Sequence, residues 1–276
     1  MLTAGAKTDE CEWRASDLLL SSWKLIKIQN NESGGNNMQT VKMIDRFEVF
    51  DQINKDLSLD MSKTAVIQID MHVRQIDPEW SAFPQPIGAK KVANTARFLN
   101  RCRGYGLPVI HVMVYKRPVE EANGSQPRRE TVKKTGMIST PYGAPKKGPY
   151  DPGAKEGYFQ WDIMPELGPA KSDYIINTKR QGTSSYFSTD LEYLIQALGV
   201  DTFLCVGINT NNCVGTFAIQ GADRGLNTIM VSDCVASTHG NDLHQFALQN
   251  MARTFGFVLT EQEAYQKIEE SMKNIK

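Results

Sequence analysis

The sequence has no excess of charge of either sign and no long apolar run. Lysine plus arginine total 31, and aspartate plus glutamate also total 31, in a chain of 276 residues. A neutral chain gives no electrostatic reason to expect nucleic acid or a membrane surface as a partner. No apolar run approaches the roughly 18 residues that a transmembrane helix needs. The composition, with 41% hydrophobic residues, is that of an ordinary globular protein.

Cysteine and histidine are scarce, at five and four residues. No cysteine pair has CxxC spacing and no histidine pair has HxxxH spacing, so we expect neither a metal nor a cofactor. An odd number of cysteines in a long chain does not indicate a disulfide framework. The first twenty residues also lack the charged start and apolar core of a signal peptide. We therefore expect reduced thiols and a cytoplasmic location.

Short apolar runs alternate with helical patterns from about residue 63 onward. Strand followed by helix, repeated, predicts a parallel sheet with helices on both faces, an α/β fold of three layers. Two helix starts carry capping boxes, Thr189 with Glu192 and Thr260 with Glu263. The strands are predicted at residues 64–69, 108–115, 174–178, 202–207, 227–232 and 256–259.

Two segments fall outside this alternation. Residues 1–62 carry no chemical motif and are interpreted as an N-terminal extension of the domain that residues 63–276 form. Residues 117–165 are rich in proline, glycine and charge, and a long irregular segment inside a compact domain is usually functional or disordered. This insert either covers the edge of its own domain or closes over the active site or a neighbouring subunit. Its aromatic residues favour packing against something: Tyr142, Tyr150, Tyr158, Phe159 and Trp161.

Polar residues follow three of the predicted strands, where parallel sheets bind their ligands. Asp70 comes directly after the run AVIQI, and a buried carboxylate is costly unless it is paired or hydrogen-bonded. Lys179 ends the strand at 174–178. Each has a simpler interpretation, a turn or helix cap for Asp70 and a solvated lysine for Lys179. The third position is the turn Thr210–Cys213.

Cys213 lies just before a predicted helix at 214–224. The helix dipole and free N–H groups would lower the pKa of a thiol there, and the same N–H groups could hold an oxyanion. The alternative is a small buried apolar residue, as most cysteines are. Together the three positions suit a general base (Asp70), a cation (Lys179) and a nucleophile (Cys213), but periodicity does not show that they meet.

Three segments in this order resemble the isochorismatase-like cysteine hydrolases, over roughly residues 63–260. AVIQIDMH resembles the family's strand ending in the catalytic aspartate, here Asp70. NTKRQGTSSYF resembles its lysine segment, with Lys179 as the catalytic lysine. VGINTNNCVGTFAIQGADRG resembles its nucleophile segment, with Cys213 as the attacking thiol. The resemblance implies a six-stranded, mostly parallel, Rossmann-like sheet and an Asp–Lys–Cys triad.

The resemblance also implies finer features of the site. An oxyanion hole would come from the backbone N–H groups of Asn212 and Cys213, and a cis peptide would join Ile208 to Asn209. His72 stands where the family commonly has glutamine. We assign His72 to the substrate pocket, together with two residues of the lysine segment, Tyr186 and Phe187. That segment is also one residue longer than usual, so Arg180 competes with the preceding lysine as the cation.

The implied activity is that of an amidohydrolase. The enzyme would cleave the C–N bond of a small carbamoyl, ureido or primary-amide compound through a thioester. Ureidoacrylate, N-carbamoylsarcosine and biuret hydrolases are the branches most alike in layout. Two alternatives stay open: a vinyl-ether hydrolase that uses Asp70 without Cys213, and a non-catalytic binding member. Family members are commonly oligomers, so the resemblance implies a homo-oligomer, a dimer or tetramer.

Overall fold

A computed structural model describes residues 47–84, 87–115, 161–180 and 183–274, together with residues 117, 119 and 142. The chain divides into two compact units, residues 1–43 and residues 44–276, and all described residues belong to the second. Within the described ranges, no helix combines the length and the apolar character needed to cross a bilayer.

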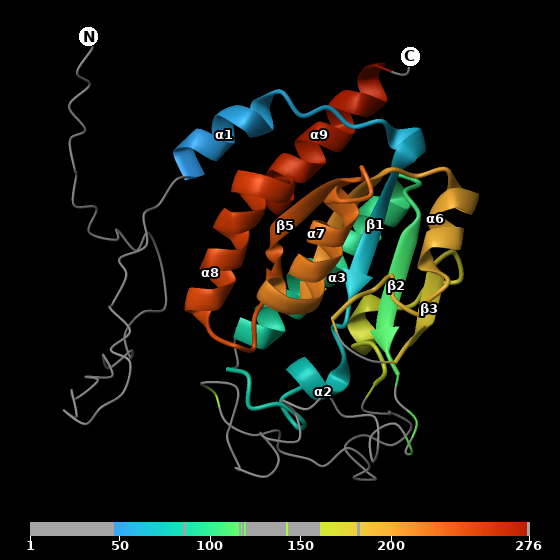
Figure 1. The fold of residues 1–276 in the computed structure, drawn as a ribbon, viewed down its shortest axis with the longest axis vertical. Helices are drawn as coiled ribbons and strands as arrows, with labels where there is room; N and C mark the ends of the chain where they lie inside the picture. Colours follow the sequence, from blue (N-terminus) through green and yellow to red (C-terminus); the bar gives the residue numbers. More distant parts are fainter. Residues whose placement is uncertain are drawn as a thin grey trace, which may run out of the picture. The chain divides into compact units, whose positions relative to one another are not determined.

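The centre of the second unit is a six-stranded parallel sheet, with strand order β3-β2-β1-β4-β5-β6. The predicted α/β fold class is confirmed, and each predicted strand is present. In Figure 1 the arrowheads of β1 and β2 point towards the short helix α2 (Val73–Ile76), which marks the carboxyl edge of the sheet. The strands are β1 (Thr64–Ile69), β2 (Val109–Val114), β3 (Tyr174–Lys179), β4 (Thr202–Ile208), β5 (Asn227–Ala236) and β6 (Phe257–Leu259).

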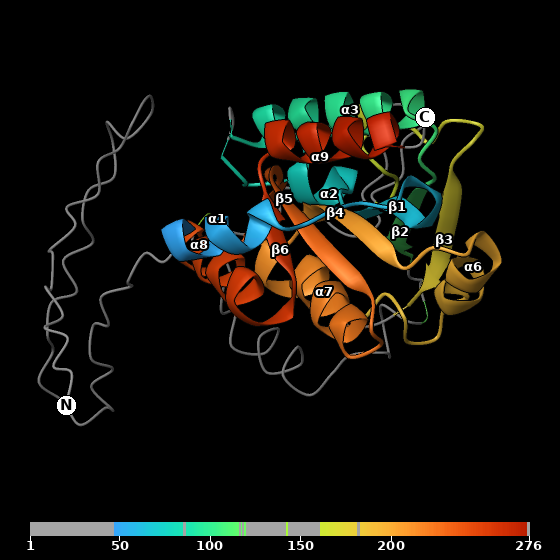
Figure 2. The same ribbon diagram turned by 90° about the horizontal axis from the view of Figure 1, so that it is seen from above.

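Helices cover both faces of this sheet, as Figure 2 shows. One face packs against α3 (Ile87–Gly104) and α9 (Glu261–Asn274). All six residues of β1 are buried, because a parallel sheet covered on both sides has no solvent face. The opposite face packs against four helices: α1 (Phe47–Lys55), α6 (Leu191–Leu198), α7 (Gly215–Ala222) and α8 (Asn241–Asn250). Short 3₁₀ helices occur at Met61–Lys63 and Pro165–Leu167, and π-helices at Thr210–Val214 and Met251–Phe255.

The two predicted capping boxes have different outcomes. Before α9, the backbone N–H of Thr260 donates to the Glu263 carboxylate (2.7 Å), and the N–H of Glu263 donates to the Thr260 hydroxyl (3.2 Å), so this box is confirmed. At α6 the prediction is wrong. Asp190 occupies the N-cap, and Glu192 forms an ion pair with Arg224, just after α7, instead of reaching back.

The compact unit begins before residue 63, so the described part of the predicted extension packs with the sheet. Phe50 on α1 belongs to the hydrophobic core on the sheet face that α6, α7 and α8 also cover. The Asn54 side chain donates to the carbonyl of Val258 on β6 (2.8 Å). The Ser271 hydroxyl of α9, the helix on the opposite face of the sheet, donates to the carbonyl of Leu59 (2.6 Å).

Candidate active site

Asp70 stands at the carboxyl end of β1 in a conformation that few residues adopt. Its φ is 51°, in the left-handed region, which aspartate tolerates better than most residues. The neighbouring strand β4 approaches closely here, because a Cβ on Gly207 would lie 2.1 Å from the carbonyl oxygen of Ile69. Strained backbone of this kind persists where the surrounding structure holds it in place. The aspartate is therefore held by the two strands around it.

The Asp70 carboxylate is completely buried and fully partnered. One oxygen, Oδ2, accepts from the Lys179 ammonium, whose side chain is also completely buried. The other oxygen, Oδ1, accepts from the backbone N–H of Val114 (3.0 Å) and lies 3.3 Å from Nε2 of His72. β1, β2 and β3 are neighbours in the sheet, so their carboxyl ends bring these groups together.

Cys213 is brought to the same place by the turn after β4. The peptide between Ile208 and Asn209 is cis, at the position that the family resemblance implies. The π-helix Thr210–Val214 then leads into α7, and π-helical turns are frequent at functional sites. The Cys213 thiol is 7% exposed and interacts with both Asp70 and Lys179 through charge and hydrogen bonding. The three predicted catalytic residues thus lie together.

The electrostatics of the three groups fix their protonation. Burial opposes ionisation of Asp70, but Lys179 and His72 outweigh it and hold the pKa of the carboxyl well below its usual range. Burial likewise lowers the pKa of Lys179, and Asp70 and Cys213 more than restore it, so that pKa lies above its ordinary value. Burial and the Asp70 charge raise the pKa of the Cys213 thiol to about 12. At neutral pH the site holds carboxylate, ammonium and thiol.

This protonation state differs from the lowered thiol pKa expected at a helix N-terminus. The interaction of a thiolate with the helix dipole contributes about 0.3–1 kcal/mol at an exposed site, which lowers the pKa by less than one unit. Removing a thiolate from water costs more than that when the group is buried beside a carboxylate. Lys179 opposes the rise but does not cancel it.

A short strap at the end of the predicted insert, residues 161–164, crosses the carboxyl edge of the sheet. It pairs with the residues after Asp70: the Val73 N–H donates to the carbonyl of Asp162 (3.0 Å), and the Met164 N–H donates to that of Met71 (3.1 Å). The Trp161 ring meets the His72 ring edge to face, with centroids 6.0 Å apart. This part of the insert therefore covers a residue that contacts Asp70.

The rest of the insert contributes one further described aromatic residue. Tyr142 packs edge to face on Phe83, with ring centroids 5.4 Å apart. Tyr150, Tyr158 and Phe159 lie outside the described residues. Whether the insert as a whole closes the pocket stays a prediction.

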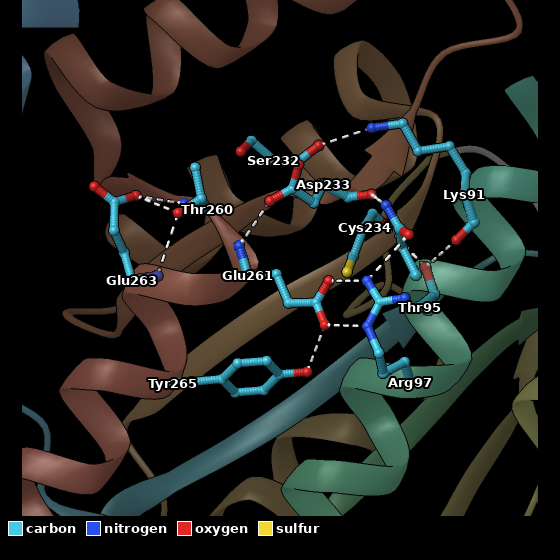
Figure 3. A network of polar contacts seen from close by, with 11 residues as sticks. Lys91, Thr95, Arg97, Ser232, Asp233, Cys234, Thr260, Glu261, Glu263 and Tyr265 are labelled. Carbon is cyan, nitrogen blue, oxygen red and sulfur yellow. Dashed lines mark hydrogen bonds and ion pairs between the residues drawn. The ribbon is translucent and has the colours of Figure 1, made fainter.

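A polar network joins α3, β5 and the start of α9 (Figure 3). β5 is irregular where it passes β4: Cys205 pairs with Met230, but Gly207 pairs with Val235. Side chains of α3 donate to the carbonyls of the extra residues, and the backbone N–H at the start of α9 donates to the Asp233 side chain. β5 leads directly to Ser237 and Thr238, which bind the turn that carries Cys213. Its bonds run from Lys91 to Ser232 O (2.9 Å), Asn94 to Asp233 O (3.1 Å), Thr95 to Cys234 O (3.2 Å) and Glu261 N to Asp233 Oδ2 (2.8 Å).

The residues after β5 form hydrogen bonds with the turn that carries Cys213. The backbone N–H and the hydroxyl of Thr238 both donate to the Asn209 side-chain oxygen (2.6 and 2.8 Å). The Ser237 hydroxyl donates to the Asn211 side-chain oxygen (2.6 Å). Sequence reasoning did not single out these residues, because serine and threonine after a strand are common in any turn.

The structure does not bring every predicted residue to the site. Arg180 donates to the carbonyls of Tyr115 and Asn177, so the buried cation beside Asp70 is Lys179. Tyr186 stacks on Phe217 with ring centroids 5.2 Å apart, and its hydroxyl lies near Gly221 in the last turn of α7, far from Cys213. Phe187 is 70% exposed. Of the three predicted pocket residues, His72 is the one with a described contact to Asp70.

The predicted oxyanion hole stays a prediction. The backbone N–H of Asn212 already donates to the carbonyl of Asn209 (2.9 Å). This donor could serve an oxyanion only by sharing or changing its acceptor. The Cys213 N–H stays a predicted donor. Among the residues described, no group of three or more His, Cys, Asp or Glu side chains could hold a metal ion.

Comparison with curated proteins finds amidohydrolases among the relatives of this chain. The chain is 27% identical to a maleamate amidohydrolase of Pseudomonas putida, over 75% of this chain and 87% of that protein. It is 25% identical to the ureidoacrylate amidohydrolase RutB of Methylobacterium radiotolerans, over 73% of this chain and 78% of that protein.

Solved structures share the fold. A cysteine hydrolase from Pseudomonas syringae has a TM-score of 0.62 at 23% identity, covering 78% of this chain and 96% of that one. An N-carbamoylsarcosine amidase from Thermoplasma acidophilum has a TM-score of 0.52 at 22% identity, covering 72% and 96%. The isochorismatase domain matches residues 64–263, a range that contains all six strands and the three converging residues. By that match the chain belongs to the isochorismatase family of hydrolases.

Proposed function

We propose that this protein is an amidohydrolase that cleaves a C–N bond of a small carbamoyl, ureido or primary-amide compound, with Cys213 as nucleophile. The observation that carries the proposal is a buried thiol placed against a buried Asp70–Lys179 pair. A nucleophile and a base within hydrogen-bond reach, with a third group orienting the base, is the arrangement that covalent catalysis requires.

The proton transfer keeps the buried site neutral. Asp70 takes the thiol proton as sulfur attacks the carbonyl carbon, so the C–S bond forms while the carbonyl π electrons move to the oxygen of the tetrahedral intermediate. One negative charge passes from the Asp70 carboxylate to that oxygen and no net charge is created, which limits the cost in a low-dielectric site. A thiol with a pKa of about 12 then needs to ionise only as the C–S bond forms.

The remaining steps return the proton and release the product. The tetrahedral intermediate collapses, the C–N bond breaks, and the leaving nitrogen takes the proton from Asp70, which leaves a thioester on Cys213. A water molecule gives its proton to Asp70 and attacks the thioester carbonyl. The C–S bond breaks and sulfur recovers the proton, so one water is consumed for each C–N bond cleaved.

The relatives' names support this reaction class over the alternatives. Both curated relatives given above are amidohydrolases, one of maleamate and one of ureidoacrylate. A vinyl-ether hydrolase would use the carboxyl group and would gain nothing from the thiol. A binding protein without turnover would not need a strained, fully buried Asp70. Homo-oligomerisation and a cytoplasmic location stay predictions of the sequence.

The test is ammonia or amine release from a panel of ureido, carbamoyl and primary-amide compounds, with mass spectrometry of the quenched enzyme. We expect turnover with an acyl adduct on Cys213, and a loss of about a thousandfold or more in Cys213→Ala. The matched control is Cys205→Ala, which removes a buried thiol in β4 away from Asp70 and should keep turnover. Full activity in Cys213→Ala would favour the vinyl-ether reaction.

A further inference from the structure

Helix α8 presents two large apolar side chains to solvent. Phe246 is 56% exposed, and Leu243, one turn earlier on the same helix, is 40% exposed. Single apolar residues on a surface are common and need no explanation. These two differ because they share one helix and lie beside a pocket that Phe246 itself borders. Exposed apolar side chains next to such a pocket are typical of a contact surface.

The pocket lies between α7 and α8, two neighbouring helices in Figure 1, and has a volume of about 90 Å³. Pockets that take a whole small-molecule ligand measure about 300–1,000 Å³, so this one has room for the end of a side chain. Its size therefore favours a protein side chain as the occupant. The lining combines an apolar floor with residues of the nucleophile turn, and it includes Thr210, Asn211, Ile219, Met230, Ala247 and Met251.

The exposed side of α8 has one charge of each sign. Asp242 lies in its first turn, Arg253 lies in the π-helix that follows it, and both are exposed. Burial lowers the pKa of His244 to about 4, so this histidine adds no charge at neutral pH. Asp242 and Arg253 are about three helical turns apart, so they project from the same side as Phe246. That side runs from a negative end through an apolar middle to a positive end.

Such a surface complements itself when two copies meet antiparallel. In a twofold contact, residue i of one copy meets residue j of the other and the reverse, so Asp242 of each copy faces Arg253 of the other. This alignment places Phe246 opposite position 249, between Ala247 and Met251, which line the pocket. The two charges and the pocket are separate observations, and both give the same alignment.

We propose that α8 pairs antiparallel with α8 of a second copy of this chain, and that each Phe246 ring enters the pocket of the other copy. The rings supply the apolar contact, whereas exposed ion pairs contribute little affinity and mainly set the alignment. Thr210 and Asn211 belong to the turn that carries Cys213, so the second copy lies against that turn. The inference goes beyond the proposed function and does not depend on it. The family resemblance implies an oligomer without saying which surface forms it.

The first test measures the mass of the full chain in solution by gel filtration with light scattering. We expect wild type to form a dimer, or a larger assembly built from dimers, and Phe246→Glu to halve that mass. The control is Tyr193→Glu, which puts the same charge on α6 at a side chain that is 77% exposed and should leave the mass unchanged. Circular dichroism checks the fold of each variant.

Two outcomes of this test overturn the inference. One is a monomeric wild type, in which the face is open or covered by another part of the same chain. The other is an assembly that Phe246→Glu leaves intact, because the contact then lies on a different surface.

The second test reverses the two charges. Asp242→Arg and Arg253→Asp each place like charges opposite each other in the antiparallel pair, so each should raise the dissociation constant of the dimer about tenfold or more. The combined variant restores opposite charges and should return the constant to within about threefold of wild type. Sedimentation equilibrium measures these constants. Unchanged constants in both single variants, or a combined variant at least as weak as the single ones, overturn the antiparallel pairing.

Discussion

A buried carboxylate lies at each end of β3, and the two have different surroundings. At the amino end, Asp173 accepts hydrogen bonds from Arg103 at both carboxylate oxygens (3.1 and 2.6 Å), accepts from the Ala170 N–H (2.7 Å), and lies 3.0 Å from Nε2 of His111. Nδ1 of His111 lies 3.1 Å from the end of the Gln68 side-chain amide, so both ring nitrogens have a polar neighbour. At the carboxyl end, Lys179 pairs with Asp70, which follows β1, and beside this pair lie the thiol of Cys213 and a nitrogen of His72 that has no hydrogen bond from the described residues.

The difference separates a carboxylate that only stabilises the fold from one that can take part in a reaction. A carboxylate whose oxygens and whose partners' atoms are all engaged has nothing left with which to react. A carboxylate with a nucleophile and an unpaired nitrogen beside it keeps groups that a substrate can engage. Burial alone does not separate the two ends, because Asp70 and Asp173 are both buried at the side chain.

The largest effect is expected from removing the cation that pairs with Asp70, compared with removing the cation that pairs with Asp173. Lys179→Met leaves Asp70 buried without its cation, so we expect a loss of about 3–5 kcal/mol in unfolding free energy. We also expect a loss of about a thousandfold or more in kcat/KM, since the thiolate loses its counter-charge. The measurements are urea unfolding and steady-state kinetics on the compound that wild type hydrolyses.

Arg103→Met is the matched control at the other end of β3. We expect it to cost about 2–3 kcal/mol in stability, because Asp173 keeps its other hydrogen bonds and Arg103 is partly exposed. Its kcat should change by less than about threefold. A large loss of kcat in a folded Arg103→Met protein would mean that the amino end also serves catalysis.

The second prediction concerns the reactivity of the thiol in the free enzyme. Because the pKa of Cys213 is raised to about 12, alkylation by iodoacetamide should be slow at pH 7 and rise about tenfold for each pH unit up to pH 9. Peptide mass spectrometry would follow the modified cysteine. A rate already at its plateau at pH 7 would show that the thiolate is present in the resting site.

The smallest expected effect is a difference in acid stability between the two ends. Burial lowers the pKa of His111 below its ordinary value of 6.5, although Asp173 opposes this, so the folded state keeps the ring neutral. The unfolded chain binds more protons below pH 6.5, and the stability that neutral His111 contributes is lost as the pH falls through that window. The corresponding loss for Asp70 begins only below pH 3.8.

Thermal melts of His111→Gln between pH 7 and pH 5 test this order. Its Tm should fall less steeply than that of wild type. His244→Gln is the control. Burial, with a smaller effect of Lys91, lowers the pKa of His244 to about 4. Protonation of His244 in the unfolded chain therefore lowers stability over the same pH range as His111, but from a different part of the molecule. Parallel curves for wild type and His111→Gln would contradict the assignment of a neutral ring.

Most of the fold could be predicted from the sequence. Runs such as TAVIQI match β1 residue for residue, because a strand buried on both faces must be apolar along its whole length. Boundaries were less certain where side chains outside the strand decide them. β5 extends to Ala236, four residues beyond the predicted end, because side chains of α3 bind the carbonyls of its irregular segment and the start of α9 binds the Asp233 side chain.

The site was predictable in its side chains and less so in its backbone. Asp70, Lys179 and Cys213 follow strand ends, and parallel strands bring such residues to one edge. The contribution of Val114 is a backbone N–H, which every residue but proline has, so no sequence signal could single it out. Tyr186 stacks on Phe217, and the sequence could not predict this, because a tyrosine near a helix start can turn either towards the site or onto the neighbouring helix.

The sequence by itself determined which segments along the chain are buried on both sides and which polar residues lie at their ends. Apolar periodicity reports burial, and burial is a property of short segments. Only the tertiary structure decided the protonation of Cys213, the pairing of Lys179 in place of Arg180, and the meeting of Trp161 with His72. These depend on distances between residues far apart in the chain and on the exclusion of water around them, and no local pattern contains either.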